Sequence, residues 1–227
     1  MARIFAFLAM LVIPAAAIPA SLADISNRDA VAALRAALGK GTQAAVDQLG
    51  VENGFWGDER VRIPLPDSMK RAESMMRRLG MGKQADDLLL RMNRAAEAAV
   101  PEARALFVDS VKKMSVQDAK NIIGGPQDAA TQYFRRTMSE PLTRRFLPIV
   151  TGAMQRVQLA ESYDRFAEHG AQLGLIKKED ANLEEYITRK ALDGLFLVMA
   201  DEEKKIRENP LQETSSILRK VFGALVR

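Results

Sequence analysis

The chain has 227 residues, with 33 lysines and arginines against 29 aspartates and glutamates, one histidine and no cysteine. The lack of cysteine excludes disulfides, cysteine catalysis and a lipid attached at a cysteine, and the single histidine excludes a histidine-rich metal site. The net charge of +4 is mild and does not by itself indicate a nucleic-acid-binding protein. We therefore expect no cofactor and no bound metal.

The first 23 residues have the pattern of a secretory signal peptide. Arg3 precedes an apolar run from Ile4 to Ile13, and small residues follow. Cleavage after Ala23 fits the pattern best, with cleavage after Ala20 as the alternative. The apolar run is shorter than the roughly 20 residues that a membrane-spanning helix needs. We expect an exported, periplasmic protein whose mature chain, residues 24–227, has no transmembrane segment and forms one helical domain, with two small domains as the alternative.

Helix-start and helix-stop signals recur along the mature chain, and strand signals are nearly absent. Ser26-Asn27-Arg28-Asp29 has the form of a capping box, and Gly39 and Gly41 are expected to loosen the helix that it starts. Pro101 should kink or restart a long helix because it lacks the N–H that would bond back to Glu97. The predicted helices are 67–79, a long one from 84, a short one from a second capping pattern at 115–118 to Gly124, and then 127–138, 140–172, 180–207 and 211–226.

The helix predicted from Asn182 to Arg207 indicates how these elements pack. Ala191, Leu192 and residues 194–200 place apolar side chains around its whole circumference, which is typical of a helix buried on all sides. It is too short to span a bilayer, and charged residues follow it. The sequence therefore predicts an all-α fold, a single compact multi-helix domain with a central buried helix near the C-terminus.

Five segments of the mature chain resemble one known family. They are Val61–Pro66, Met92–Glu97, Tyr133–Arg135, Lys190–Phe196 and Glu202–Pro210. In order, and over nearly all of the mature chain, they resemble the bacterial envelope family called domain of unknown function 4197. The resemblance implies a helical, exported domain of proteobacterial type without an assigned activity. Some members carry a lipid-attachment cysteine after the signal, which this chain lacks, so lipid anchoring is not implied.

Asp193 falls within an apolar arc of the predicted central helix. A buried carboxylate is costly unless it is paired and hydrogen-bonded, so we expect Asp193 to meet Lys190 or an arginine from another helix. We interpret this group as a structural polar latch between core helices, with a ligand or catalytic site as the alternative. The other candidates for the polar network or ligand site are Asn93, Arg94, Glu97 and Glu202.

The segment from Leu49 to Pro66 is the second candidate for function. It has no helical period, contains three glycines and holds the only tryptophan, Trp56, beside Phe55. Loops of this length are uncommon in compact domains and are often functional. The alternative is a strap along the surface with Trp56 inserted into the core.

No set of residues indicates catalysis. His169 is the only histidine, and its place near a predicted helix end favours a capping or surface role over a catalytic triad. Basic and aromatic residues near 133–136 and 144–146, and the apolar stripe of the last helix, could contact phosphate or a membrane, but they are more typical of core faces with cations at the edge. Export argues further against nucleic acid as a partner.

These features favour a non-catalytic periplasmic binding or interaction module. Its partner would be a small apolar, lipid-like ligand held between helices, or an envelope protein. The first alternative is a hydrolase or transferase that uses a buried carboxylate and arginine network around Asp193 with Glu97 and Glu202. The second is a purely structural envelope protein. Two carboxylates meeting in one solvent-filled cleft would favour the enzyme, and a dry network would favour the other two.

Overall fold

The computed structural model of the chain describes residues 25–113, 119–172 and 182–225. In these ranges the elements are helices and turns without strands, so the all-α fold class is confirmed. The signal peptide, its cleavage site and the capping pattern at 115–118 lie outside the described residues. The helices are α1 (Asn27–Leu49), α2 (Asp67–Arg78), α3 (Gly82–Lys113), α4 (Ala119–Ile123), α5 (Ala129–Arg156), α6 (Leu159–Gln172), α7 (Leu183–Glu208), the 3-10 turn η2 (Pro210–Gln212) and α8 (Ser216–Gly223).

α1 starts at the predicted cap but does not loosen at its glycines. The Oγ of Ser26 accepts a hydrogen bond from the backbone N–H of Asp29 at 3.0 Å, which satisfies one free donor of the first turn. The helix then continues through Gly39 and Gly41 to Leu49, so the predicted loosening is wrong. A Cβ at Gly41 would lie 3.3 Å from the Cα of Met199, and the glycine therefore lets α1 and α7 cross at short range.

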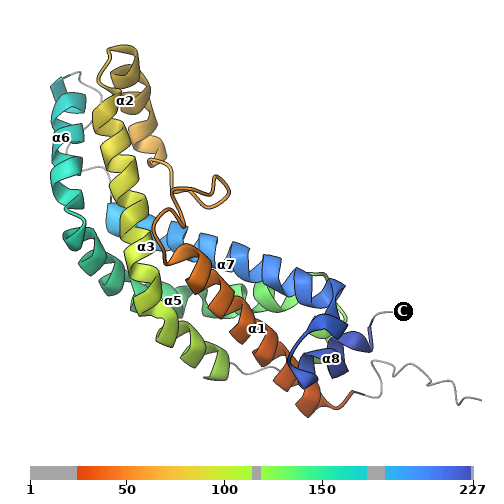
Figure 1. Ribbon diagram of the computed structural model, residues 1–227. Helices are drawn as coiled ribbons and strands as arrows, with labels where there is room; N and C mark the ends of the chain where they lie inside the picture. Colours follow the sequence, from red (N-terminus) through yellow and green to blue (C-terminus); the bar gives the residue numbers. More distant parts are fainter. Residues whose placement is uncertain (1–24, 114–118, 173–181, 226–227) are drawn as a thin grey trace, which may run out of the picture.

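Prolines inside helices bend the chain here without ending it. α3 continues past Pro101, and Figure 1 shows that its axis changes direction along its length, so the expected kink is present and the restart is not. The predicted break between 138 and 140 is wrong, because α5 runs through Pro141 and Pro148 to Arg156. Leu142, Phe146 and Val150, which follow Pro141, lie in the core, and this packing outweighs the missing backbone hydrogen bond.

The break in this region lies later than the sequence indicates. α5 ends before Val157 and Gln158, and Gln158 has a φ of 54°, a left-handed conformation that no α-helix contains. The last predicted helix is also shorter than 211–226, because η2 precedes it and α8 spans only Ser216–Gly223.

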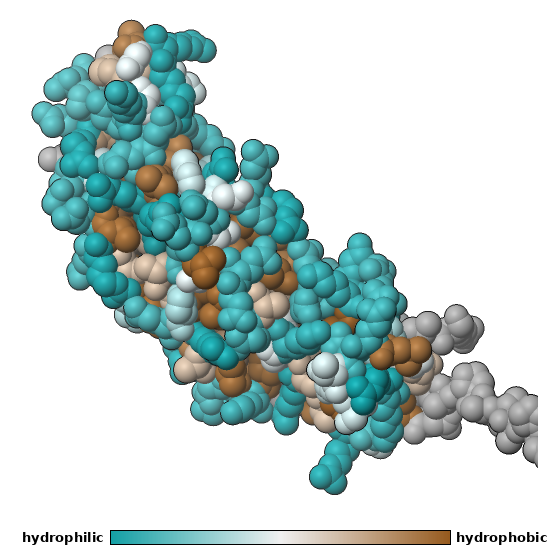
Figure 2. Space-filling model, in the orientation of Figure 1, coloured by the Kyte–Doolittle hydropathy of each residue, from teal (hydrophilic) through white to brown (hydrophobic). Residues whose placement is uncertain are grey.

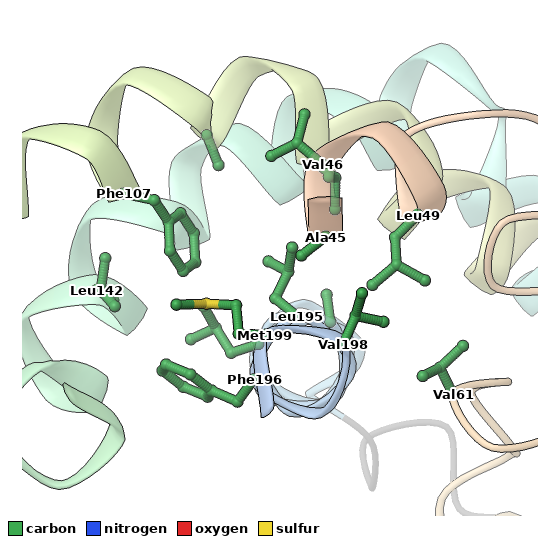
Figure 3. Close-up of a cluster of buried hydrophobic side chains, with 14 of the residues drawn as sticks. Ala45, Val46, Leu49, Val61, Phe107, Leu142, Leu195, Phe196, Val198 and Met199 are labelled. Carbon is green, nitrogen blue, oxygen red and sulfur yellow. The ribbon is translucent and has the colours of Figure 1, made fainter. Parts of the chain in front are cut away.

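α7 is the central helix that the sequence predicts. Figure 3 looks along it and shows Leu195, Phe196, Val198 and Met199 pointing to different sides, toward Ala45, Val46 and Leu49 of α1, Phe107 of α3 and Leu142 of α5. The apolar contact does not extend around the whole circumference, however. Leu197 is 38 % exposed, and Lys190 and Asp193 on the same face are only partly covered.

The helices form an elongated, bent body. In Figure 1 the turn between α2 and α3 lies at one end, and α8 and the start of α1 lie at the other, with α7 passing through the middle. Figure 2 shows that hydrophilic side chains cover most of this face and that hydrophobic ones appear as small separate patches. No helix in the described ranges is both long enough and apolar enough to cross a bilayer.

Candidate functional site

Residues 50–66, which we call the strap, connect α1 to α2 and are fastened to α3 by Asn93. The Asn93 Oδ1 accepts a hydrogen bond from the N–H of Ile63 at 2.8 Å, and its Nδ2 donates to the carbonyl of Ile63 at 3.0 Å and to that of Leu89 at 2.8 Å. Asn93 and Ile63 are both fully buried. One side chain thus pairs both backbone groups of Ile63 as a neighbouring β-strand would.

Glu97, one turn further along α3, holds the other part of the strap. Its Oε1 accepts hydrogen bonds from the backbone N–H groups of Phe55 and Trp56, each at 3.0 Å. Its Oε2 pairs with Arg94 at 2.5 Å. The guanidinium of Arg94 also donates to Asn53 Oδ1 at 2.9 Å and to Glu52 at 3.1 Å. The buried Glu97 carboxylate is therefore paired and hydrogen-bonded as burial requires.

The strap interpretation fits this geometry, but the side chain inserted into the core is Phe55. Phe55 is fully buried, and a Cβ at Gly194 of α7 would lie 2.8 Å from its Cε1 atom. Trp56 is half-buried, so its predicted place in the core is wrong. The Arg62 guanidinium lies 4.9 Å from the Trp56 ring centroid, and Arg62 Nε donates to the Trp56 carbonyl at 2.7 Å.

Asp193 is not the buried carboxylate that we predicted. Its side chain is 47 % exposed, because the strap covers its face of α7 only in part. It forms an ion pair with Arg135 of α5, and so meets an arginine from another helix as expected. Lys190 instead lies over the ring of Tyr186, with 5.9 Å between its Nζ and the centroid. The strap is what Asn93, Arg94 and Glu97 bind through their hydrogen bonds. The prediction of a single network around Asp193 is therefore wrong.

A cleft of about 420 Å³, the strap cleft, opens between the strap, the start of α5 and the exposed face of α7. It lies within the size range of small-molecule sites. Two residues of the predicted site, Lys190 and Asp193, line it. The full lining is Arg60, Val61, Arg62, Pro64, Asp128, Thr131, Gln132, Arg135, Lys190, Asp193, Gly194, Phe196, Leu197, Ala200 and Asp201.

Each carboxylate of the strap cleft has a partner on the protein. Asp193 pairs with Arg135, and Asp201 pairs with Arg60 at 2.7 Å. Asp128 accepts a hydrogen bond from the side-chain amide of Gln132 at 3.0 Å. Hydrogen bonds from Arg60 to Asp58 and Asp201 raise the pKa of the Arg60 guanidinium, so it stays charged throughout the accessible pH range.

Glu202 lies outside the strap cleft, in an ion-pair cluster with α1. Lys40 Nζ lies 3.1 Å from Glu202 and 2.8 Å from Glu213. Burial would raise the pKa of Glu202, but the hydrogen bond and charge of Lys40 outweigh it and lower the pKa. Burial likewise acts to lower the pKa of Lys40, and the hydrogen bonds to Glu213 and Glu202 raise it on balance.

The most buried ion pair in the described residues was not predicted. Glu203 and Arg207 of α7 are 2.8 Å apart, with side chains only 2 % and 9 % exposed. Glu203 accepts hydrogen bonds from the N–H groups of Ala130 and Thr131 at the start of α5, at 2.9 and 2.8 Å. Arg207 donates to the last carbonyls of α4 and lies 5.0 Å from the Phe222 ring centroid. The pair thus caps two helices at once.

The sequence carried a weak signal for this pair. Glu203 and Arg207 are four positions apart, which is the spacing of a helical ion pair. The adjacent Glu202, however, makes the segment resemble a solvent-exposed helix face. Only the position of α4 and α5 shows which of the neighbouring glutamates points inward.

A larger hollow of about 710 Å³ lies at the corner between α5 and α6. Its described lining contains Glu161 and Glu184 and no positively charged side chain, and none of the predicted site residues lies there. Among the residues that the structure describes, no three carboxylate or histidine side chains gather as a metal site would require. The strap cleft is therefore the candidate site, as a place for binding.

The comparisons with known proteins agree with the resemblance seen in the sequence. The model of one family, described as "Protein of unknown function (DUF4197)", matches residues 24–223. No curated protein and no solved structure matches the chain. Because the family match covers far more than half of the chain, the protein belongs to the DUF4197 family.

Proposed function

We propose that the chain is a non-catalytic binding module of the bacterial envelope, exported to the periplasm, and that it binds its ligand or partner in the strap cleft. The observation that carries the proposal is the construction of this cleft. Three segments far apart in the sequence form it, and buried contacts at Asn93, Glu97 and Phe55 hold one wall, the strap, against α3 and α7. A site fixed before binding loses little conformational entropy when it is occupied.

The mixed chemistry of the lining supports binding. Val61 and Phe196 provide a buried apolar floor, Leu197 exposes an apolar side chain beside them, and the rim carries charged groups. A few polar groups placed around an apolar surface are typical of small-molecule sites. The proposed periplasmic location rests on the signal-peptide pattern of residues 1–23.

One observation favours the hydrolase or transferase alternative. Asp128, Asp193 and Asp201 line the same cleft, and catalysis by paired carboxylates requires two such groups with different pKa values. Against it, arginines hold two of these carboxylates, and Glu97, buried beneath the strap, accepts hydrogen bonds from backbone N–H groups. These carboxylates are therefore already engaged by groups of the protein.

Native mass spectrometry of the protein isolated from the periplasm tests the proposal, with Leu197→Trp as the cleft-blocking variant. The matched control is Leu211→Trp, since Leu211 is 74 % exposed and lies in η2, outside the cleft. We expect a bound small molecule or protein on the wild type and the control, and its loss from Leu197→Trp. An unchanged complex in Leu197→Trp, or no bound species in mass spectrometry and crosslinking, would overturn the proposal.

Two further readouts test the other parts of the proposal. N-terminal sequencing of the periplasmic protein should give Asp24 as the first residue, and cytoplasmic retention would contradict the address. Ester and phosphoester substrates should remain intact with the pure protein. Hydrolysis that Asp193→Asn abolishes, and that the exposed control Asp164→Asn leaves unchanged, would establish the enzyme instead.

A further inference from the structure

We infer that the strap cleft binds a single anionic group, a carboxylate or a phosphate monoester, that is joined to an apolar chain. The inference rests on the proposed function and adds the chemical class of the ligand. It follows from three features of the cleft: cations without a carboxylate partner, an arginine with spare donors, and an adjoining apolar surface.

The positive charge of the strap cleft is only partly neutralised. Within the described residues, no carboxylate lies within ion-pair distance of Arg62 or Lys190, although both line the cleft. The hydrogen bond from Lys70, and to a smaller degree the charge of Lys190, lowers the pKa of Asp67. Arg62 Nε donates a hydrogen bond to the Trp56 carbonyl, and the two terminal nitrogens of the guanidinium remain available as donors. The aspartates of the cleft, by contrast, are engaged by Arg135, Arg60 and Gln132. Among the described residues, the donors that remain available in the cleft therefore carry positive charge, and Asp128, which pairs only with the neutral Gln132 amide, keeps its negative charge.

Arg135 can take part in binding because its own pair is exposed. The side chains of Arg135 and Asp193 are 45 % and 47 % exposed, and the contact uses only Nη2 of the guanidinium. An ion pair this exposed contributes little to stability, so an incoming anion can share the arginine at small cost. The guanidinium also lies 5.7 Å from the Phe196 ring centroid, which holds it at the apolar floor.

The apolar chain of the ligand has a surface on which to lie. Val61 and Phe196 form the floor, and Leu197 is exposed next to them. A second hollow of about 360 Å³ adjoins the cleft and shares Arg135, Asp193 and Phe196 with it, so the ion pair stands between the two spaces. An anionic head at Arg135 can therefore have its chain on either side of Phe196.

The same charges disfavour larger anions. A nucleic acid needs a row of cations that follows its phosphates, and Asp128, Asp193 and Asp201 interrupt such a row here. One anionic group can approach Arg62, Lys190 and Arg135 while the aspartates keep their own partners. The geometry thus selects an amphiphile with one anionic head group.

Trp56 provides a built-in reporter, because it is the only tryptophan and Arg62 is stacked on it. The probes are octyl phosphate, octanoate, inorganic phosphate and octanol, titrated against full-length mature protein with fluorescence and calorimetry. We expect octyl phosphate and octanoate to bind at least about tenfold more tightly than phosphate or octanol, since only they use both surfaces. Binding should weaken as salt is added.

The variants separate a binding role from a structural one. Arg62→Gln and Lys190→Gln should each weaken octyl phosphate binding about tenfold, while the exposed controls Arg71→Gln and Lys83→Gln on α2 and α3 should not change it. Asp193→Asn should strengthen binding, because it removes a negative charge and frees Arg135. A merely structural role of Asp193 would not produce tighter binding.

A vesicle experiment identifies the source of the anionic group. Pelleting with vesicles of phosphatidic acid and phosphatidylcholine, lost in Arg62→Gln, would assign it to a membrane lipid. Octyl phosphate binding without pelleting would assign it to a free amphiphile.

Two results would overturn the inference and leave the proposed function in place. The first is equal affinity for octanol and octyl phosphate. The second is no binding of any probe while Leu197→Trp still removes a bound molecule from the purified protein. Absence of both probe binding and a bound molecule would instead contradict the proposed function.

Discussion

Asn93 and Ile63 are joined by two hydrogen bonds that pair the side-chain amide of one with both backbone groups of the other. The pair is fully buried, so removal of the amide leaves an N–H and a C=O of the strap without partners. We expect Asn93→Ala to lower the free energy of unfolding by about 2 to 4 kcal/mol. Urea unfolding measures this, and Asn121→Ala at an exposed position of α4 is the control. Equal stability of the two variants would show that the strap is not fastened at this point.

The Glu203 and Arg207 pair gives the largest expected loss of stability. Glu203→Gln keeps the shape of the side chain but leaves the Arg207 guanidinium buried without its countercharge, which costs about 3 to 5 kcal/mol. Glu208→Gln, at an exposed site on the same helix, should change stability by less than about 1 kcal/mol. Thermal unfolding compares the two. Near-wild-type stability of Glu203→Gln would mean that water supplies the lost contacts.

Lys40 and Glu202 predict a pH dependence. The pKa of Glu202 is lowered in the folded chain, so its contribution is present above its ordinary value of 4.5 and is lost as the pH falls through the lower folded value. The pKa of Lys40 is raised, so its contribution is present below 10.5 and is lost as the pH rises through the higher folded value. The stability difference between wild type and Lys40→Met should thus be constant from about pH 6 to 9 and shrink on either side. A difference that does not vary with pH would exclude the ion pair as its cause.

Gly39 and Gly41 give a paired test of the crossing between α1 and α7. No atom lies within 4 Å of a Cβ placed at Gly39, so Gly39→Ala should stabilise the helix by about 0.5 to 1 kcal/mol. At Gly41 the new methyl group would meet the backbone of Met199, and Gly41→Ala should be neutral or destabilising. Chemical unfolding of both variants checks this. A gain at Gly41 as large as that at Gly39 would mean that the crossing can widen freely.

The sequence predicted what depends on local pattern. The cap at Ser26, the helical class and the central position of α7 follow from spacing along single helices, and each is confirmed. Of the seven residues predicted for a site, Lys190 and Asp193 line the strap cleft, and Asn93, Arg94 and Glu97 hold its wall. Trp56 belongs to this wall without lining the cleft, and Glu202 lies elsewhere.

What the sequence did not predict depends on neighbours that are distant along the chain. Asp193 occupies an apolar arc on a helical wheel, but a wheel does not show that the strap covers this arc only in part. Gly41 was expected to loosen its helix, because the sequence alone does not show that the backbone of Met199 lies close to it. Glu203 could be distinguished from Glu202 only by the position of the first turn of α5.

The crossing of α1 and α7 also bears on the order in which the chain can fold. Thr42 and Met199 meet there although 157 positions separate them in the sequence. During synthesis from the N-terminus, α1 can pack on α3 and α4 first, but its contact with α7 has to wait for almost the whole chain. Closing so long a segment is slow compared with forming the local helix pairs α2–α3 and α5–α6. A chaperone that covers α1 until α7 arrives would protect the nascent protein from aggregation.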